Sequence, residues 1–139
     1  MADSDDRFDA RESAVSVTDA LDSLTEFWSQ RVLGEANGTL LKVAKGTGST
    51  RWHSHDDQDE VFLIIEGTLR IQLRDRNVNL NVGDLFVVPR GVEHCPIADE
   101  EVRFLIVGTE ITSTAAGGKP DWSANGGALP VEFETRAER

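Results

Sequence analysis

The sequence predicts an all-β fold, a sandwich or barrel, for most of its 139 residues. From residue 31 onward, short apolar segments recur at the spacing of about 8–12 residues that is typical of such folds, with turn residues between them. Some of these segments alternate apolar and polar residues, as strands with one buried face do. The pair Asn37-Gly38 lies between two of them and is a strong local signal for a β-hairpin.

The segments expected to form strands are separated by residues that favour turns. These segments are 31–36, 39–45, 50–55, 61–65, 68–74, 78–82, 85–88, 92–97 and 102–108. The acidic residues 99–101 are expected to form a turn before the last strand. The side chains expected to line the core and the lumen are Phe62, Ile64, Leu69, Ile71, Phe86, Phe104 and Ile106.

Alternation predicts which side chains of two strands face inward. In segment 68–74, the expected inward residues are Leu69, Ile71 and Leu73, and the expected outward residues are Arg70, Gln72 and Arg74. In the next segment, the expected inward residues are Val78, Leu80 and Val82.

The two ends of the chain differ in composition from the predicted domain, which is expected to span residues 15–108. Residues 1–14 are acidic and poor in apolar side chains, so we expect a flexible segment. A short helix is expected over 18–27, with Thr18 as its N-cap. Residues 109–139 are rich in Gly, Ala, Ser and Thr, and we expect an extended tail.

The charge of the chain excludes some classes of partner. The formal net charge is −11, from 14 Lys and Arg against 25 Asp and Glu, which argues against binding to nucleic acid or to an anionic membrane. No apolar run reaches the roughly 18 residues of a membrane span. The acidic start does not resemble a signal peptide, and the lone Cys95 has no partner for an intramolecular disulfide, so we expect a cytoplasmic location.

All three histidines lie in two short windows of the sequence. His53 and His55 are two positions apart, so in an extended strand their imidazoles point to the same face. Glu60 follows the polar turn at 56–59 and opens an apolar strand that would return its carboxylate to the histidines. With His94, these residues would provide three nitrogens and one oxygen for a divalent metal, with positions left for water or substrate.

Arg51 is a candidate for binding an acidic ligand. In a regular strand its side chain shares a face with His53, and a guanidinium in the lumen would bind a carboxylate or a phosphate. Alternatively, Arg51 lies at the edge of the strand and reaches solvent or pairs with the acidic turn at 56–59.

The spacing of the two windows follows a known pair of motifs. The first is His-x-His, four residues, Glu, six residues and Gly, here His53, His55, Glu60 and Gly67. The second is Gly, five residues, Pro-x-Gly, two residues and His, here Gly83, Pro89, Gly91 and His94. Both resemble the signature motifs of the cupins, and in particular of small one-domain cupins often labelled mannose-6-phosphate-isomerase-like. Ala98 stands where the cupin motif often has Asn.

The resemblance implies a jelly-roll barrel with one divalent metal in its mouth. Cupins bind Fe, Mn, Ni, Cu or Zn, and many are dimers, so a homodimer is expected here. The resemblance also implies that His53, His55, Glu60 and His94 are the ligands of the metal.

Two main classes of function are compatible with such a site. One is a metal-dependent enzyme, of the isomerase or oxygenase type, acting on a small polar or anionic molecule in the lumen. The other is a protein that binds or senses a small ligand without turnover; a metal-free barrel is a third alternative. The chain has no tyrosine, so a general base would have to be Glu, Asp or a metal-bound hydroxide. The sequence identifies no catalytic residue beyond the candidate ligands.

Overall fold

The long strand β7 (His94–Gly108) pairs with three other strands in the computed structural model, which describes residues 8–110. Its second half lies between β2 (Thr39–Ser49) and β3 (Glu60–Glu66), and its first half pairs with β4 (Leu69–Leu73). β7 therefore connects two parts of one sheet, and every other strand pairs with it or with one of its neighbours.

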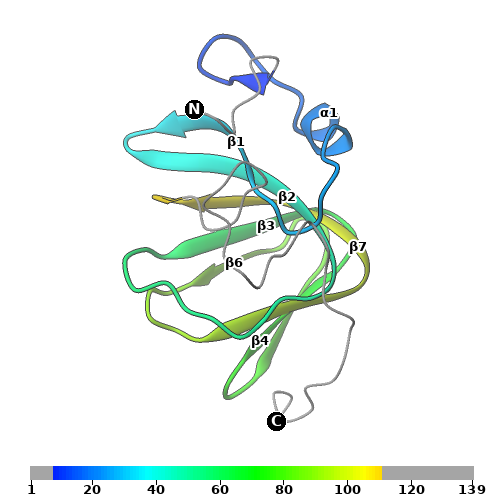
Figure 1. The fold of residues 1–139 in the computed structure, drawn as a ribbon, viewed down its shortest axis with the longest axis vertical. Helices are drawn as coiled ribbons and strands as arrows, with labels where there is room; N and C mark the ends of the chain where they lie inside the picture. The colour runs from blue at the N-terminus through cyan, green and yellow to red at the C-terminus, as the bar shows by residue number, and fades with distance from the viewer. Residues whose placement is uncertain (1–7, 111–139) are drawn as a thin grey trace.

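The remaining elements extend the sheet or cover it. β1 (Arg31–Ala36) pairs with β2, β5 (Asn77–Leu80) with β4, and β6 (Leu85–Val88) with β3, all antiparallel. Figure 1 shows this sheet rolled into a barrel, with the only helix of the described residues, α1 (Val17–Asp22), at one end of it. The expected all-β jelly roll is confirmed.

The hairpin between β1 and β2 has the predicted turn. Ala36 pairs with Thr39, and the two residues between them both have positive φ, 55° for Asn37 and 80° for Gly38. That combination belongs to the type I′ turn, whose twist matches that of the two strands.

The predicted strand 50–55 is wrong as a continuous strand. The N–H of Thr50 donates to the carbonyl of Pro96, and His53 exchanges two hydrogen bonds with His94. The segment therefore advances by three residues, from Thr50 to His53, while β7 advances by only two, from Pro96 to His94. The extra residue forms a bulge, of the kind that re-aims side chains beside functional sites.

The predicted turn at 99–101 is also wrong, because β7 runs through it. Between the pairs Gly46–Val102 and Gly48–Ala98, four steps on β7 oppose two on β2. The exposed acidic residues 99–101 are thus extra residues in an irregular stretch of β7, and the chain does not reverse direction there.

Two inward–outward expectations and the bounds of the helix also need correction. Gln72 is buried rather than exposed, and its amide donates to the carbonyl of Cys95 at 3.4 Å. Val82 is 62% exposed because it follows the end of β5 and lies in the turn to β6.

The helix is shorter than expected, and its N-cap is Ser16 rather than Thr18, with the Ser16 hydroxyl accepting from the N–H of Asp19.

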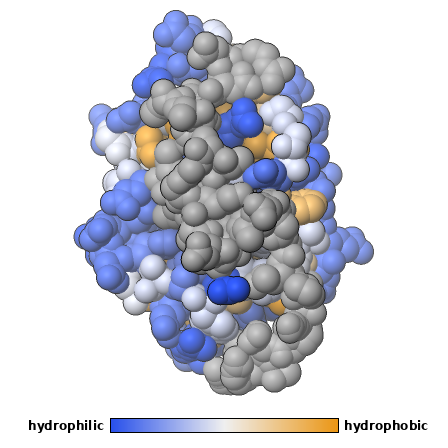
Figure 2. Space-filling view, in the orientation of Figure 1, coloured by the Kyte–Doolittle hydropathy of each residue, from blue (hydrophilic) through white to orange (hydrophobic). Residues whose placement is uncertain are grey.

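Buried apolar side chains form two clusters, one on each side of the sheet. The cluster inside the barrel contains six of the seven predicted residues, and the seventh, Phe86, packs against it partly buried. The second cluster lies between α1 and the outer face of the sheet and includes Leu21, Leu33 and Val43. Around these clusters, hydrophilic residues dominate the described part of the face in Figure 2, as expected from the high negative charge.

Parts of the predicted ends of the chain lie outside the described residues. This applies to 1–7 of the expected flexible segment and to 111–139 of the expected tail. Within the described part, the N–H of Ala10 donates to the carbonyl of Leu33 at 2.7 Å, so this segment contacts β1. No helix among the described residues has the length and apolar character needed to cross a membrane.

Trp28 closes one side of the lumen. Its φ is 65°, its backbone N–H donates to the carbonyl of Lys45, and its indole N–H donates to the carbonyl of Thr47. The six-membered part of the ring lies directly over Gly46 of β2, where a Cβ would come within 2.6 Å of it. This contact requires glycine at position 46.

We expect Gly46→Ala to lower the free energy of unfolding by about 1–3 kcal/mol, because the added methyl group overpacks against Trp28. Urea denaturation measures the effect. In a Trp28→Phe background the contacted ring atoms are gone, so the same substitution should cost less than half as much. An equal cost in both backgrounds would contradict the proposed contact.

Candidate metal centre

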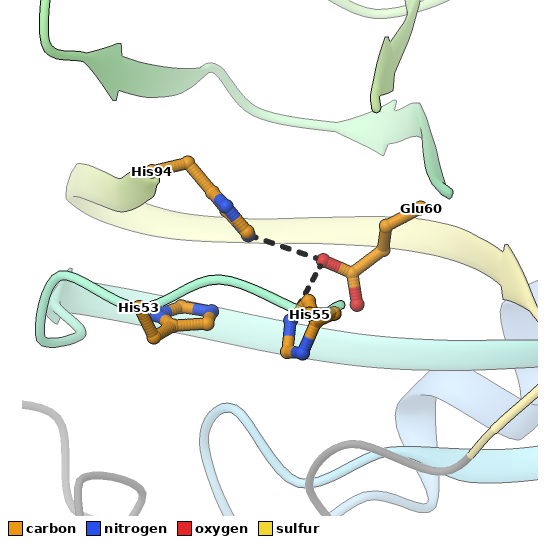
Figure 3. A group of neighbouring side chains, drawn as sticks. All are labelled: His53, His55, Glu60 and His94. Atoms are coloured by element: carbon orange, nitrogen blue, oxygen red, sulfur yellow. Dashed lines mark hydrogen bonds and ion pairs between the residues drawn. The ribbon is translucent and has the colours of Figure 1, made fainter. Parts of the chain in front are cut away.

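His53, His55, Glu60 and His94 converge at one point of the barrel wall (Figure 3). One potential ligand atom from each lies within 4.8 Å of those of the others. His94 begins β7, Glu60 begins β3, and the other two come from the segment between β2 and β3. The predicted convergence is therefore present, although the strand from which we derived it is not regular.

The bulge opposite β7 explains how two histidines of an irregular segment reach the same place. The backbone of His53 pairs with that of His94, which sets the two imidazole centroids 4.4 Å apart. His55 lies beyond this bridge, and its carbonyl accepts from the N–H of Gly91, in the turn before β7. The imidazoles of His53 and His55 are 4.9 Å apart.

Backbone carbonyls orient two of the imidazoles. The Nδ1 atom of His53 is 2.6 Å from the carbonyl oxygen of Arg51, and the Nδ1 atom of His94 is 2.9 Å from that of Val92. A carbonyl can only accept, so both Nδ1 atoms carry the proton. In the neutral rings each Nε2 therefore presents a lone pair, as in metal sites whose ligands are oriented by outer hydrogen bonds.

Glu60 lies almost entirely out of water, with 2% of its surface exposed. Its Oε1 atom is 3.3 Å from Nε2 of His94 and 3.4 Å from Nε2 of His55. Burial by itself would raise the pKa of Glu60, but the His55 and His94 rings outweigh it and hold this pKa below its usual value. The carboxylate is therefore ionised.

The arrangement fits a cation. Oε1 of the ionised Glu60 lies 3.3 Å from Nε2 of His94 and 3.4 Å from Nε2 of His55, so the carboxylate and two ring nitrogens meet at one point. A divalent ion with bonds of about 2.0–2.2 Å could bind these atoms together, and the mixed nitrogen and oxygen donors suit a transition metal.

A small cavity of about 20 Å³ extends from the site into the barrel, with room for about one water molecule. Most of its wall is apolar. Its lining residues are Trp28, Gln30, Ala44, Thr50, His53, Glu60, Phe62, Pro96, Phe104 and Ile106. The sequence analysis identified His53 and Glu60 but not Thr50 or Gln30, and Gln30 lies more than twenty positions from the nearest histidine in the sequence.

Arg51 contributes its backbone to the site through the bond to His53. Its side chain is exposed and does not line the cavity described above. The part played by its guanidinium stays a prediction.

The fold agrees with comparisons to known proteins. The sequence profile of the cupin domain (Cupin_2) matches residues 39–108, which is half of the chain and contains all four converging residues. The chain belongs to the cupin family. As a cupin, it is 42% identical to a cupin-2 domain containing protein from Shewanella frigidimarina, over 67% of this chain and 91% of that one, with a TM-score of 0.65.

Two further similarities cover less of the proteins compared. This cupin is 35% identical over 63 residues to the uncharacterized protein YdbB of Bacillus subtilis, and the match spans 45% of this chain and 56% of that relative. It is also 25% identical to the polyketide cyclase RemF from Streptomyces resistomycificus, with a TM-score of 0.52 over 58% of this chain and 64% of RemF.

Burial and the neighbouring His94 ring lower the pKa of His53 from 6.5 to about 4. Between these pH values the unfolded state holds a proton that the folded state lacks. We expect the free energy of unfolding of the metal-free protein to be highest above pH 6.5 and to fall as the pH is lowered toward 4.

Urea denaturation across this pH range, after dialysis against a chelator, measures the effect. A His53→Gln variant should show a shallower slope in the same window. Identical slopes for the two proteins would refute the assignment to His53.

Proposed function

We propose that this cupin binds one divalent transition metal, Fe, Mn, Ni, Zn or Cu, through His53, His55, Glu60 and His94. We further propose that it acts on a small polar or anionic molecule in the barrel lumen, as an enzyme of the isomerase or oxygenase type. The observation that carries the proposal is the convergence of four potential ligand atoms, all within 4.8 Å of one another.

Each candidate ligand has a role that follows from its surroundings. In neutral rings of His53 and His94, the carbonyls near Nδ1 favour the tautomer whose Nε2 carries a lone pair for a metal. Glu60 supplies a negative charge that offsets part of the charge of the ion. When bound, such an ion acts as a Lewis acid toward a carbonyl or hydroxyl group, and iron can also activate dioxygen.

Removing a ligand should weaken metal binding more than removing an outer hydrogen bond does. We expect His55→Ala and Glu60→Gln each to lower the affinity for Zn²⁺ by at least about a hundredfold, beyond the 10–100-fold typical of outer-shell changes. Competition with a chromophoric chelator measures the affinity, and elemental analysis gives the stoichiometry.

The matched control is Asp57→Asn, which removes an exposed carboxylate from the same loop. Its affinity should equal that of the wild type. The proposal fails if the wild type binds no divalent ion, or if Asp57→Asn loses as much affinity as Glu60→Gln.

A binding or sensing function without turnover is the alternative. It is favoured by the wall of the cavity, where His53 and Glu60 are the only acid–base side chains among the described residues. Oxygen consumption by the iron-loaded protein with small acids, phenols and sugars distinguishes the two functions. Stabilisation by one of these compounds without turnover would support the alternative. The similarity to a polyketide cyclase agrees with an organic small molecule as ligand.

Arg51 is retained as a candidate that holds an acidic group of the ligand at the entrance. What supports this is its charge and its position two residues before His53. A cytoplasmic location also stays a prediction.

We also propose that the protein is a homodimer. An apolar row crosses the outer face of the sheet through the paired residues Leu41, Val107, Val61 and Val87. Beside this row, Leu85 is 60% exposed on β6, which is an edge strand of the sheet. Exposed apolar surface of this kind marks interaction sites.

We expect Leu85→Lys to convert the dimer into a monomer, because it places a charge in the apolar contact. Size-exclusion chromatography with light scattering gives the mass directly. The control is Glu100→Lys, which also changes the charge of an exposed residue but outside this surface, and it should stay dimeric. A monomeric wild type would rule out the dimer.

A further inference from the structure

The loop that joins the candidate ligands His55 and Glu60 continues the sheet by side-chain contacts. Glu60 is the first residue of β3, and β3 lies between β6 and β7 in the sheet. The backbone pairing of β3 with either neighbour does not extend before Glu60. Whatever holds residues 56–59 in place must therefore come from other contacts, although the sequence suggested only a polar turn there.

Asp59 fastens the loop to the turn between β6 and β7. Its Oδ1 atom accepts from the backbone N–H of Arg90 at 2.9 Å, and the guanidinium Nε of the same residue lies 3.6 Å from it. The next N–H of the turn, that of Gly91, donates to the carbonyl of His55 at 2.8 Å. Two successive N–H groups of one turn therefore hold the loop at both of its ends.

Gln58 fastens the loop on the opposite side, to the end of β7. It is 3% exposed, and its Oε1 atom accepts from the N–H of Glu110 at 3.2 Å. Its side chain fills the space over Gly108, where a Cβ would collide with Oε1. The Nε2 atom of Gln58 is buried without a hydrogen-bond partner, which costs free energy, so stability alone does not account for an amide at this position.

The other two residues of the loop face solvent. Asp56 and Asp57 are exposed, and within the described part of the chain neither carboxylate has a hydrogen-bond or ion-pair partner. Asp57 and Asp59 thus carry the same charge two positions apart, but only Asp59 reaches the turn. This difference separates the effect of the contact from the effect of the charge.

We propose that Asp59 and Gln58 are positioning residues of the candidate metal centre, which anchor the loop on both sides and so fix His55 and Glu60 at its ends. Neither belongs to the group of converging ligands. Ordering a loop costs conformational entropy, and contacts that order it before an ion arrives remove that cost from metal binding. This inference rests on the proposed metal centre and adds the residues that hold two of its ligands together.

The test measures the affinity of the full chain for Zn²⁺ by competition with a chromophoric chelator. Asp59→Ala removes the acceptor for the N–H of Arg90, and Gln58→Met removes the acceptor for that of Glu110. We expect each to bind Zn²⁺ about tenfold more weakly than the wild type, as changes outside the ligands do. Asp59→Asn should lose less than about threefold, because its amide oxygen still accepts the bond while the charge is gone.

The matched control is Asp57→Ala, which removes an exposed carboxylate from the same loop and should bind Zn²⁺ as the wild type does. The inference is overturned if Asp59→Ala binds as tightly as Asp57→Ala. It is also overturned if Asp59→Asn loses as much affinity as Asp59→Ala, because the charge and not the anchor would then be responsible.

Hydrogen exchange of the Gly91 amide in the metal-free protein gives a readout that needs no ion, since this amide is bound to the carbonyl of His55. We expect it to exchange at least about fivefold faster in Asp59→Ala than in the wild type, and at the wild-type rate in Asp57→Ala. Equal rates in all three proteins would show that Asp59 does not hold His55.

The two measurements separate the inference from the proposed function. A wild type that binds zinc, with affinity unchanged in Asp59→Ala, refutes the positioning role and leaves the metal centre intact. A wild type that binds no zinc refutes the proposed function, and the exchange rate of Gly91 then decides whether the loop is anchored. If Gln58→Met unfolds, the exposed site at Asp59 decides the outcome.

Discussion

The convergence of four side chains at the mouth of the barrel is the constraint on which the rest of the structure depends. Three imidazoles and a buried, ionised carboxylate occupy one small volume, and backbone carbonyls lie within hydrogen-bond distance of Nδ1 in two of the rings. Such a group is costly without a cation between its members. The sheet maintains the arrangement because β3, which begins with Glu60, pairs with the second half of β7, while His94 at the start of β7 pairs with β4 and with His53.

The bulge opposite β7 connects the fold to the site. A regular continuation of β2 would place the residues after Ser49 in simple register with β7. The surplus residue between Thr50 and His53 shifts this register by one, and the two hydrogen bonds between His53 and His94 then fix it again. The segment between β2 and β3 can thus leave the sheet, place His55 beside the other candidate ligands and turn back into β3.

Local signals in the sequence were sufficient to predict most of the sheet and the four converging residues. The Asn37-Gly38 turn and the motif spacing act over a few residues, and their geometry follows from backbone rules. What the sequence did not reveal depends on contacts between distant segments. The path of β7 through 99–101 depends on its pairing with β2, and the burial of Gln72 on its pairing with β7.

The measurement that tests the central claim most directly is X-ray absorption spectroscopy of the protein loaded with one equivalent of Zn²⁺. A site built from these four residues predicts nitrogen and oxygen neighbours at about 2.0–2.2 Å, with the outer scattering of three imidazole rings. A spectrum without imidazole scattering, or one dominated by water oxygens, would contradict it.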